Sequence, residues 1–324
     1  MTHAIRVHET GGPEALRYEE VEVGDPGPGE ALIRQTAIGI NFIDVYHRSG
    51  LYPQPAPFIP GSEAAGVVEA VGPGVTDIAV GDRVAYVIAG GAYAERRLAP
   101  ADRLVKIPEG VDDATAAAMM LKGMTARYLL RATYAVGPST RLMFHAAAGG
   151  VGLIVGQWAR HLGAPAIIGT VGTPEKAALA REHGYTHVID YSTEDFVART
   201  REITGGAGVD VVYDSVGKDT FPASLDCLRP RGLWVTFGQS SGALPPLDTG
   251  LLSRKGSLFM TRPSVFHYTA TRADLVETAS DLFEVVRSGA VKVPVSRIYP
   301  LKDAAKAHAD LEGRRTTGSM VLIP

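Results

Sequence analysis

The chain has 324 residues, of which 45% are hydrophobic and 21% charged, with a formal net charge of −3. This length predicts two domains, since single hydrophobic cores usually stop growing near ~250–300 residues. The weak negative charge argues against nucleic acid or an anionic membrane as the main partner. No apolar run reaches the ~18–20 residues that span a bilayer, and residues 1–6 lack a signal-peptide pattern, so we expect a cytoplasmic protein.

Short strands and turns dominate the first 120 residues. Segments 31–40, 61–72 and 81–86 have the apolar patterns of strands bounded by glycines. The prolines at 53, 55, 57 and 60 mark a long irregular loop. This part of the chain is typical of a compact β-rich domain.

The pattern changes after residue 110, where helices are predicted over 112–118 and 125–133. From residue 141 onward strands and helices alternate, as in a parallel sheet with crossover helices. Strands are predicted over 141–146, 166–171, 187–190, 209–214, 232–237 and 256–261, and helices over 151–162, 174–183, 192–203 and 219–228. A helix over 273–289 and strands over 291–295 and 319–323 follow. We expect this tail to return to the first domain, which gives domains of 1–124 with 267–324, and 125–266.

The most informative motif is the glycine turn at residues 145–152, between the first of those strands and its helix. Gly149 would let the backbone approach a pyrophosphate, and Gly152 would let the helix pack close to the strand. The free N–H groups at the helix N-terminus would face the phosphates. Ala147 stands where the usual fingerprint has its first glycine. A dinucleotide site is therefore predicted, and a plain glycine turn between packed elements is the alternative.

The tip of the second strand indicates which nicotinamide cofactor binds. An NAD site usually has Asp or Glu there to bind the ribose 2′-hydroxyl, but this strand ends in Gly172 and Thr173. Lys176 follows in the first helical turn and offers a charge-assisted bond to a 2′-phosphate. Glu175 is counter-evidence, although an acidic residue also suits a helix N-terminus. NADPH is favoured over NADH; taken alone, Lys176 is equally compatible with a solvated surface lysine.

Neither a metal site nor a hydrolase site is predicted. The chain has one cysteine and nine scattered histidines, and Ser62 stands where a zinc-binding sequence of similar shape would have histidine. The Gly-x-Ser-x-Gly elbow of many hydrolases is missing. Cys227 is expected to be a core residue.

Several motifs together carry a family resemblance over essentially the full length. They lie at residues 39–46, 48–53, 60–66, 121–126, 146–152, 212–217 and 237–242. The chain resembles the zinc-free branch of the medium-chain dehydrogenase/reductase superfamily, and within it the NADPH:quinone oxidoreductases that include zeta-crystallin. The resemblance implies an α/β fold with a GroES-like, β-rich catalytic domain and a Rossmann domain with a doubly wound, parallel six-stranded sheet.

The resemblance also implies NADPH as the cofactor and places residues around it. The pyrophosphate would face Gly149, Gly150 and Val151. Lys176 and Tyr191 would hold the 2′-phosphate, Gly172 would give backbone room, and Arg314 would reach the same phosphate. The nicotinamide side would be lined by Asn41, Thr125, Gly238, Ser240 and Arg262, and Val216 joins the cofactor residues.

Three side chains are candidates to bond the acceptor oxygen: Asn41, Tyr46 and Tyr52. Each has a structural alternative: a loop-capping amide for Asn41, a core-covering ring for Tyr46, and a plain surface aromatic for Tyr52. Two further residues, His145 and Asp214, end strands at the ligand-binding edge. A buried histidine bonded to a backbone carbonyl and a turn-forming aspartate are the plainer interpretations of these two.

The predicted function is metal-free hydride transfer from NADPH to a quinone. Reduction of an activated C=C bond in an enal or enone is an alternative, because both reactions deliver hydride to a conjugated acceptor. A non-enzymatic role, as an RNA-binding or crystallin-like structural protein, is disfavoured by the negative charge. The resemblance implies a homodimer joined through the last Rossmann strand, around residues 258–260, since so apolar an edge strand is a liability when bare.

Overall fold

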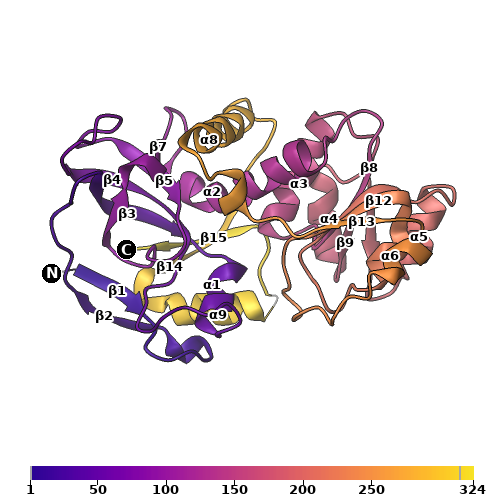
Figure 1. Ribbon diagram of the computed structural model, residues 1–324, viewed down its shortest axis with the longest axis horizontal. Coiled ribbons are helices and arrows are strands. Elements are labelled where there is room, and N and C mark those ends of the chain that lie inside the picture. Colours follow the sequence, from indigo (N-terminus) through magenta and orange to yellow (C-terminus); the bar gives the residue numbers. More distant parts are fainter. Residues whose placement is uncertain (1, 314) are drawn as a thin grey trace. The chain divides into compact units, whose positions relative to one another are not determined.

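The computed structural model describes residues 2–313 and 315–324, and it divides into two compact units. Unit 1 comprises Met1–Met124, Thr269–Arg287 and Val293–Pro324. Unit 2 comprises Thr125–Tyr268 and Ser288–Lys292. Figure 1 shows unit 1 in indigo and violet with the yellow C-terminal elements, and unit 2 in magenta to orange.

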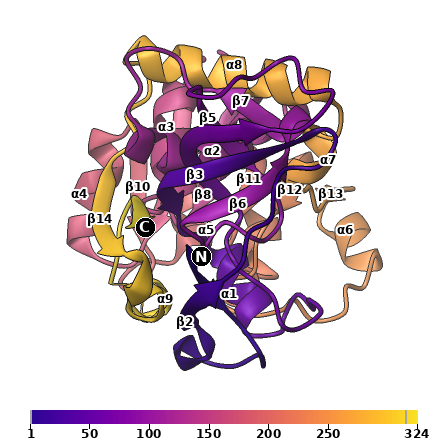
Figure 2. The same cartoon turned by 90° about the vertical axis from the view of Figure 1, so that its left-hand side faces the viewer.

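Unit 1 is built on a seven-stranded sheet whose order is β14-β15-β3-β4-β5-β7, with β6 also pairing with β3. Its strands are β3 (Glu30–Gly39), β4 (Glu63–Val71), β5 (Arg83–Val87), β6 (Arg96–Pro100), β7 (Leu104–Lys106), β14 (Val295–Pro300) and β15 (Ser319–Ile323). A separate pair joins β1 (Thr2–Arg6) to β2 (Arg17–Val21). The strand β15 runs antiparallel to β3, with Val321 opposite Gly39, so the end of the chain completes the sheet begun near its start (Figure 2).

The helices of unit 1 are α1 (Phe42–Arg48), α2 (Asp113–Arg127), α8 (Arg272–Arg287) and α9 (Ala304–Glu312). The prediction of two separate helices over 112–118 and 125–133 is wrong, because α2 continues into a π-helix at Tyr128–Thr133. Gly123 does not break the helix: a Cβ there would lie 2.4 Å from a Leu282 methyl, so this glycine permits close packing against α8.

Unit 2 contains six parallel strands in the order β10-β9-β8-β11-β12-β13, which confirms the predicted doubly wound sheet. They are β8 (Arg141–His145), β9 (Ala166–Val171), β10 (His187–Asp190), β11 (Val209–Asp214), β12 (Leu228–Thr236) and β13 (Phe259–Thr261). Its helices are α3 (Gly150–His161), α4 (Pro174–Glu182), α5 (Phe196–Ile203), α6 (Gly250–Arg254) and α7 (Val265–Tyr268). The chain turns back between β8 and β11, and ligands of such sheets bind outside the carboxyl ends of the strands at that switch.

Two predicted elements of this region differ in the structure. The helix expected over 219–228 is reduced to a 3₁₀ turn at Ala223–Cys227, since Pro222 lacks the N–H that a helix interior uses. The strand expected over 291–295 begins only at Val295. The Gln157 side-chain amide bonds both the N–H and the C=O of Lys292, at 2.9 Å each, and so keeps that backbone out of a sheet ladder.

Among the described residues, no helix has both the length and the apolar character that crossing a membrane requires.

Candidate active site

The glycine turn after β8 presents backbone N–H groups at the start of α3. Ala146 adopts a left-handed conformation with φ of 60°, which costs a non-glycine residue roughly 1–2 kcal/mol. A Cβ on Gly152 would lie 2.5 Å from the Ala146 carbonyl oxygen, so the helix approaches the turn closely only with glycine there. The first intrahelical bond runs from Leu153 N–H to the Gly149 carbonyl at 2.9 Å. The N–H groups of residues 150–152 therefore have no helical acceptor and suit an anion.

Gly172, Lys176 and Tyr191 gather beyond the carboxyl ends of β9 and β10. The Tyr191 N–H donates to the Val171 carbonyl at 3.0 Å, which continues the pairing of the two strands. A Cβ on Gly172 would lie 2.6 Å from the Tyr191 hydroxyl oxygen, so glycine lets the ring lie against the end of β9. Tyr191 is 48% exposed, although it is a large aromatic, and its hydroxyl is accessible to a ligand.

The helix that carries Lys176 is capped locally. Thr173 is the N-cap of α4, and its hydroxyl accepts the Lys176 backbone N–H at 3.3 Å. Hydrogen bonds from its own backbone N–H and from the Thr173 hydroxyl lower the pKa of the Glu175 carboxyl. This supports the interpretation of Glu175 as a helix N-terminal residue.

The loops after β11 and β12 are held together by Asp214. One of its carboxylate oxygens accepts the backbone N–H groups of Val216 and Gly217, at 2.9 and 3.1 Å. The other accepts the Thr220 and Ser224 hydroxyls and the Trp234 indole N–H, at 2.8, 3.1 and 3.3 Å. Asp214 is therefore a turn-forming residue, as one of the two interpretations predicted, and it is completely buried.

The same loops bring together four of the predicted cofactor residues. The Ser240 N–H donates to the Ser215 carbonyl at 3.1 Å, next to Val216. A Cβ on Gly238 would lie 2.8 Å from that carbonyl, which requires glycine at this crossing. Arg262, directly after β13, donates to the Thr236 hydroxyl at 3.3 Å and to the Gln239 side chain at 3.1 Å. Val216, Gly238, Ser240 and Arg262 thus share the carboxyl edge of the sheet.

Two other predicted cofactor residues are not placed in these groups. Thr125 is a buried residue near the end of α2. The hydrogen bonds described above for the loops after β11 and β12 do not include it. Arg314 lies outside the residues that the structure describes.

Asn41 caps the first helix of unit 1 and is held by buried groups. Its backbone N–H donates to the Asp44 side chain at 2.9 Å in the capping box that begins α1. Its side-chain Nδ2 donates to Glu63 Oε1 at 2.8 Å. The same Oε1 accepts the Lys122 ammonium at 2.6 Å. Asn41 is 7% exposed, so its amide is fixed and only a small face of it reaches the surface.

The two candidate tyrosines lie against each other beside α1. The rings of Tyr46 and Tyr52 meet edge-on with centroids 5.1 Å apart, and the Tyr52 N–H donates to the Tyr46 carbonyl at 3.0 Å. Phe42 and His47 lie on either side, with centroids 6.3 Å from Tyr46 and 6.1 Å from Tyr52. Tyr46 and His47 are buried, so this cluster of four rings has only part of its edges available to a flat, conjugated molecule.

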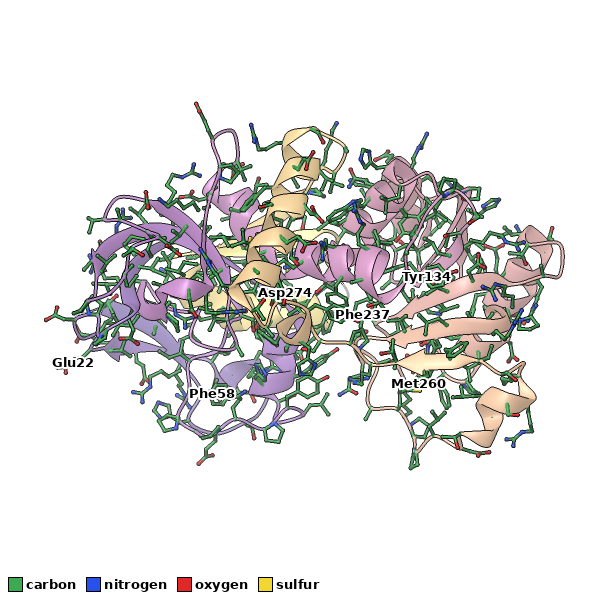
Figure 3. The ribbon with its side chains drawn as sticks, turned by 45° about the horizontal axis from the view of Figure 1, so that its top comes forward. Glu22, Phe58, Tyr134, Phe237, Met260 and Asp274 are labelled. Carbon is green, nitrogen blue, oxygen red and sulfur yellow. The ribbon has the colours of Figure 1, made fainter. Side chains whose placement is uncertain are left out.

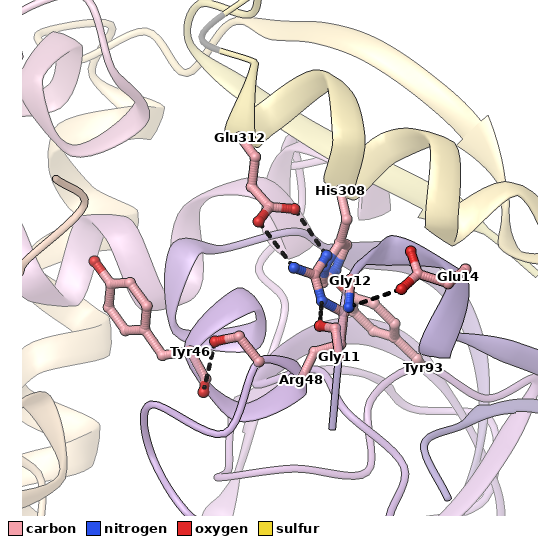
Figure 4. A network of polar contacts seen from close by, with 9 residues as sticks. Gly11, Gly12, Glu14, Tyr46, Arg48, Tyr93, His308 and Glu312 are labelled. Carbon is pink, nitrogen blue, oxygen red and sulfur yellow. Dashed lines mark hydrogen bonds and ion pairs between the residues drawn. The ribbon is translucent and has the colours of Figure 1, made fainter. Parts of the chain in front are cut away.

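A buried polar network connects α1 to α9 (Figure 4). The Tyr93 hydroxyl lies 3.1 Å from Asp44 Oδ2 and 2.9 Å from His308 Nε2. The Arg48 guanidinium bonds both Glu312 oxygens at 2.8 Å and the Gly11 carbonyl at 3.1 Å. Burial raises the pKa of Asp44 to about 7. Burial, with a contribution from the Arg48 charge, lowers the pKa of His308 to about 3.

His145 and Cys227 are interior residues of unit 2. The His145 ring nitrogens lie 2.9 Å from the Thr170 hydroxyl and 3.0 Å from the Ser224 hydroxyl, so its partners are side chains and not the expected backbone carbonyl. Burial lowers the pKa of His145, which keeps the imidazole neutral. Burial raises the pKa of the Cys227 thiol to about 12, as fits a core cysteine.

Sequence reasoning assigned no role to Glu63 or Lys122, although both stand inside quoted motifs. The signal was available: each is a single charge within an otherwise apolar run, at residues 61–68 and 117–124. Opposite charges in two apolar runs predict a buried pair, because a lone buried charge is too costly to keep.

Comparison with known proteins gives a consistent result over the whole chain. The family model "Alcohol dehydrogenase GroES-like domain" matches residues 27–109, and the model "Zinc-binding dehydrogenase" matches residues 150–284. Quinone oxidoreductase 1 of Escherichia coli is 51% identical over 328 residues, covering 100% of both chains. The chain belongs to the quinone oxidoreductase family. The predicted family and its GroES-like and Rossmann domains are thereby confirmed.

Other members of the quinone oxidoreductase family and its relatives are equally near. The crystal structure of Escherichia coli quinone oxidoreductase complexed with NADPH is 52% identical, with a TM-score of 0.98, and covers 99% of this chain and 100% of that one. A 2-haloacrylate reductase from a Burkholderia species is 51% identical over 336 residues, covering 100% of this chain and 99% of that protein.

The residues of this family member do not fit a zinc ion, although one matching model carries that description. The Ser62 hydroxyl is committed to Asp44 at 3.0 Å, and Glu63 is bound by Asn41, Lys122 and the Leu121 N–H. A buried ammonium 2.6 Å from Glu63 repels a cation. Among the described residues, no three His, Cys, Asp or Glu side chains gather as a metal ion requires.

NADPH, by contrast, fits unit 2. The N–H groups that begin α3 have no helical acceptor and suit a pyrophosphate. Tyr191, directly after β10, and Lys176, in the first turn of α4, carry a hydroxyl and a positive charge that suit a phosphate monoester.

Proposed function

We propose that this chain is an NADPH-dependent quinone reductase that works without a metal. The observation that carries the proposal is the tip of β9, where Gly172, Tyr191 and Lys176 stand in place of the carboxylate that selects NADH. When bound, NADPH supplies the hydride. The family membership and the relatives called quinone oxidoreductases support the acceptor class.

The chain's own residues bind the cofactor and stabilise the product. Gly149, Gly150 and Val151 hold the pyrophosphate through backbone N–H groups, and Lys176 with Tyr191 holds the 2′-phosphate. Val216, Gly238, Ser240, Arg262 and Thr125 line the nicotinamide pocket. The roles of Asn41 at the nicotinamide and of Arg314, which lies outside the described residues, stay predictions from the family resemblance.

The acceptor is held by the elements around α1. Asn41, Tyr46 and Tyr52 donate hydrogen bonds to the oxygen on which negative charge develops during hydride transfer. The four-ring cluster around Tyr46 supports a flat aromatic acceptor, because offset and edge-to-face ring contacts favour quinones over small aliphatic molecules. A quinone becomes a stabilised phenolate, and this lowers the demand on the protein for charge stabilisation.

Reduction of an activated C=C bond is the second candidate. The 51% identical 2-haloacrylate reductase supports it, because a haloacrylate is a double bond conjugated to a carboxylate. Both candidates use the same cofactor site, so only the acceptor distinguishes them.

Steady-state kinetics with NADPH and NADH, using a simple benzoquinone or naphthoquinone and, in parallel, an enal and 2-chloroacrylate, test the proposal. We expect NADPH preference and higher kcat/KM with the quinone. Lys176→Ala should raise the KM for NADPH about tenfold and leave that for NADH unchanged, as expected for loss of a charge-assisted bond worth ~1.5 kcal/mol. Equal use of both cofactors would overturn the phosphate site. Turnover of the C=C acceptors alone would overturn the quinone assignment.

We further propose a homodimer joined through β13. This strand is the edge of the sheet, Met260 lies on it (Figure 3), and Phe259 is 62% exposed. A bare apolar edge strand is an aggregation hazard, which pairing with a second copy would remove. Sedimentation equilibrium tests this, and a monomeric mass at micromolar concentration would overturn it. A cytoplasmic location stays a prediction.

A further inference from the structure

Three buried polar residues of unit 1 form a cluster, and the proposed chemistry uses only one of them, Asn41. Asn41 and Lys122 both donate to the same Glu63 oxygen, at 2.8 and 2.6 Å. Glu63 is completely buried, and the side chain of Lys122 is 8% exposed. We call this cluster the Asn41–Glu63–Lys122 triad.

The backbone around Glu63 is arranged to hold its carboxylate in one place. Its second oxygen accepts the N–H of Leu121, from within helix α2, at 2.5 Å. A Cβ on Gly39 would lie 2.3 Å from Glu63 Oε1, so β3 carries glycine where the carboxylate needs room. A strand, a helix and a glycine therefore converge on one side chain.

Burying this ion pair costs free energy that apolar side chains in the same space would not cost. Taking two charges out of water costs several kcal/mol per ion in general, and well-packed apolar residues of similar volume often give equal or better stability. The site does not fit zinc either, although the matching model for the other half of the chain is described as a zinc-binding dehydrogenase. The pair therefore calls for a role other than stability or metal binding.

That role follows from the chemistry of the Asn41 amide. A carboxylate only accepts hydrogen bonds, so Glu63 dictates that the NH₂ end of the amide, and not its oxygen, faces it. One N–H of Asn41 is thereby committed, and the direction of the second N–H is fixed with it. The Lys122 ammonium lies 2.6 Å from the Glu63 oxygen that accepts the Asn41 amide, so the carboxylate is held from a second side.

We propose that Glu63 and Lys122 are positioning residues for acceptor reduction, which set the orientation of the Asn41 amide toward the acceptor oxygen. This inference rests on the proposed role of Asn41. In this proposal the buried Glu63–Lys122 ion pair fixes the polar group that faces the substrate. Specificity for the acceptor step then lies in unit 1.

The test uses an isosteric variant without buried charge, Glu63→Gln with Lys122→Met, so that neither partner is left unpaired. Its steady-state kinetics are compared with those of Asn41→Ala and of the triple variant. The acceptor used is the one that the wild type reduces. A wrong substrate assignment therefore does not affect the test of the triad proposal. We expect kcat for the acceptor to fall at least tenfold in the double variant, with the KM for NADPH unchanged.

Because Glu63 acts through Asn41, the triple variant should be no slower than Asn41→Ala by more than about twofold. A merely structural role would lower Tm and raise the KM for NADPH, and its effect would multiply with that of Asn41→Ala. The matched control is Glu69→Gln, on the same strand β4, which removes an ion pair with Arg96 at 2.7 Å and should leave kcat unchanged.

Three results would overturn the proposal: a folded double variant with wild-type kcat, a loss that multiplies with that of Asn41→Ala, or an Asn41→Ala variant as fast as wild type. If the double variant does not fold, Glu63→Gln alone replaces it in the comparison with Asn41→Ala. The same three results would then overturn the proposal.

Discussion

The Arg48–Glu312 ion pair makes an asymmetric prediction about stability. Arg48 is 2% exposed, whereas Glu312 is 34% exposed. Glu312→Gln leaves a guanidinium buried without its anion, and breaking a buried pair in this way costs roughly 3–5 kcal/mol. We expect a value near ~3 kcal/mol, because the glutamine oxygen still accepts one N–H.

Removing the buried partner should cost less than removing the exposed one. In Arg48→Met the Glu312 carboxylate is free to hydrate, and the methionine fills the space of the aliphatic stem. The chief loss is the bond to the Gly11 carbonyl, worth ~1 kcal/mol, so we expect ~1–2 kcal/mol in total. The double variant should resemble Arg48→Met alone.

Differential scanning calorimetry suits this measurement, because a chain with two units can show more than one transition. At ~2–4 °C per kcal/mol for domains of this size, Glu312→Gln should lower Tm by roughly 6–12 °C, and Arg48→Met by roughly 2–8 °C. Equal or greater loss in Arg48→Met would refute the reasoning, since the buried charge would then not govern the cost.

Three further predictions concern two buried aspartates and a buried histidine. Burial raises the Asp44 pKa from 3.8 to about 7, so between those pH values the folded protein retains a proton that the unfolded chain releases, and the group lowers stability as pH rises. Asp44→Asn should remove this pH-dependent loss of stability, which amounts to up to ~4 kcal/mol. The Tm of the variant should therefore rise relative to that of the wild type between pH 4 and pH 7. A difference in Tm that stays constant with pH would contradict this prediction. His308, with its pKa lowered to about 3, gives the opposite slope, which His308→Gln should remove. In unit 2, Asp214→Asn removes the acceptor either of the Val216 and Gly217 N–H groups or of the hydroxyls bound to the other oxygen. We expect Tm to fall and the Kd for NADPH, measured by fluorescence titration, to rise about tenfold. An unchanged Kd would show that this loop does not hold the cofactor.

Much of the fold was predictable because its elements follow simple periods. The six Rossmann strands and the helices α3, α4 and α8 were predicted within a few residues, since buried parallel strands and amphipathic helices mark themselves in sequence. The two helices predicted over 112–118 and 125–133 are joined across Gly123, where glycine allows close packing against α8. The Leu282 methyl that this glycine accommodates is 282 − 123 = 159 residues later in the chain, so the local sequence does not show the contact.

Long-range polar partners could not be predicted in the same way. The segment at 291–295 looked like a strand, and only the amide of Gln157, 135 residues earlier, shows why its backbone is bonded elsewhere. Glu63 and Lys122 were visible as charges in apolar runs, but their shared partner Asn41 depends on β3, β4 and α2 meeting. The candidate site was thus predictable as a set of motifs and not as a set of contacts.

The pairing of β15 with β3 also has a consequence for the order in which the protein is made. Val321 pairs with Gly39, a separation of 321 − 39 = 282 residues. During synthesis, every strand of unit 2 leaves the ribosome before this partner of β3 exists. The Rossmann unit is complete in sequence while part of the β3 edge is still unpaired, and such edges attract other strands. Completion of unit 1 therefore waits until β15 has been made, and loss of β15 would leave a folded Rossmann unit attached to an open sheet.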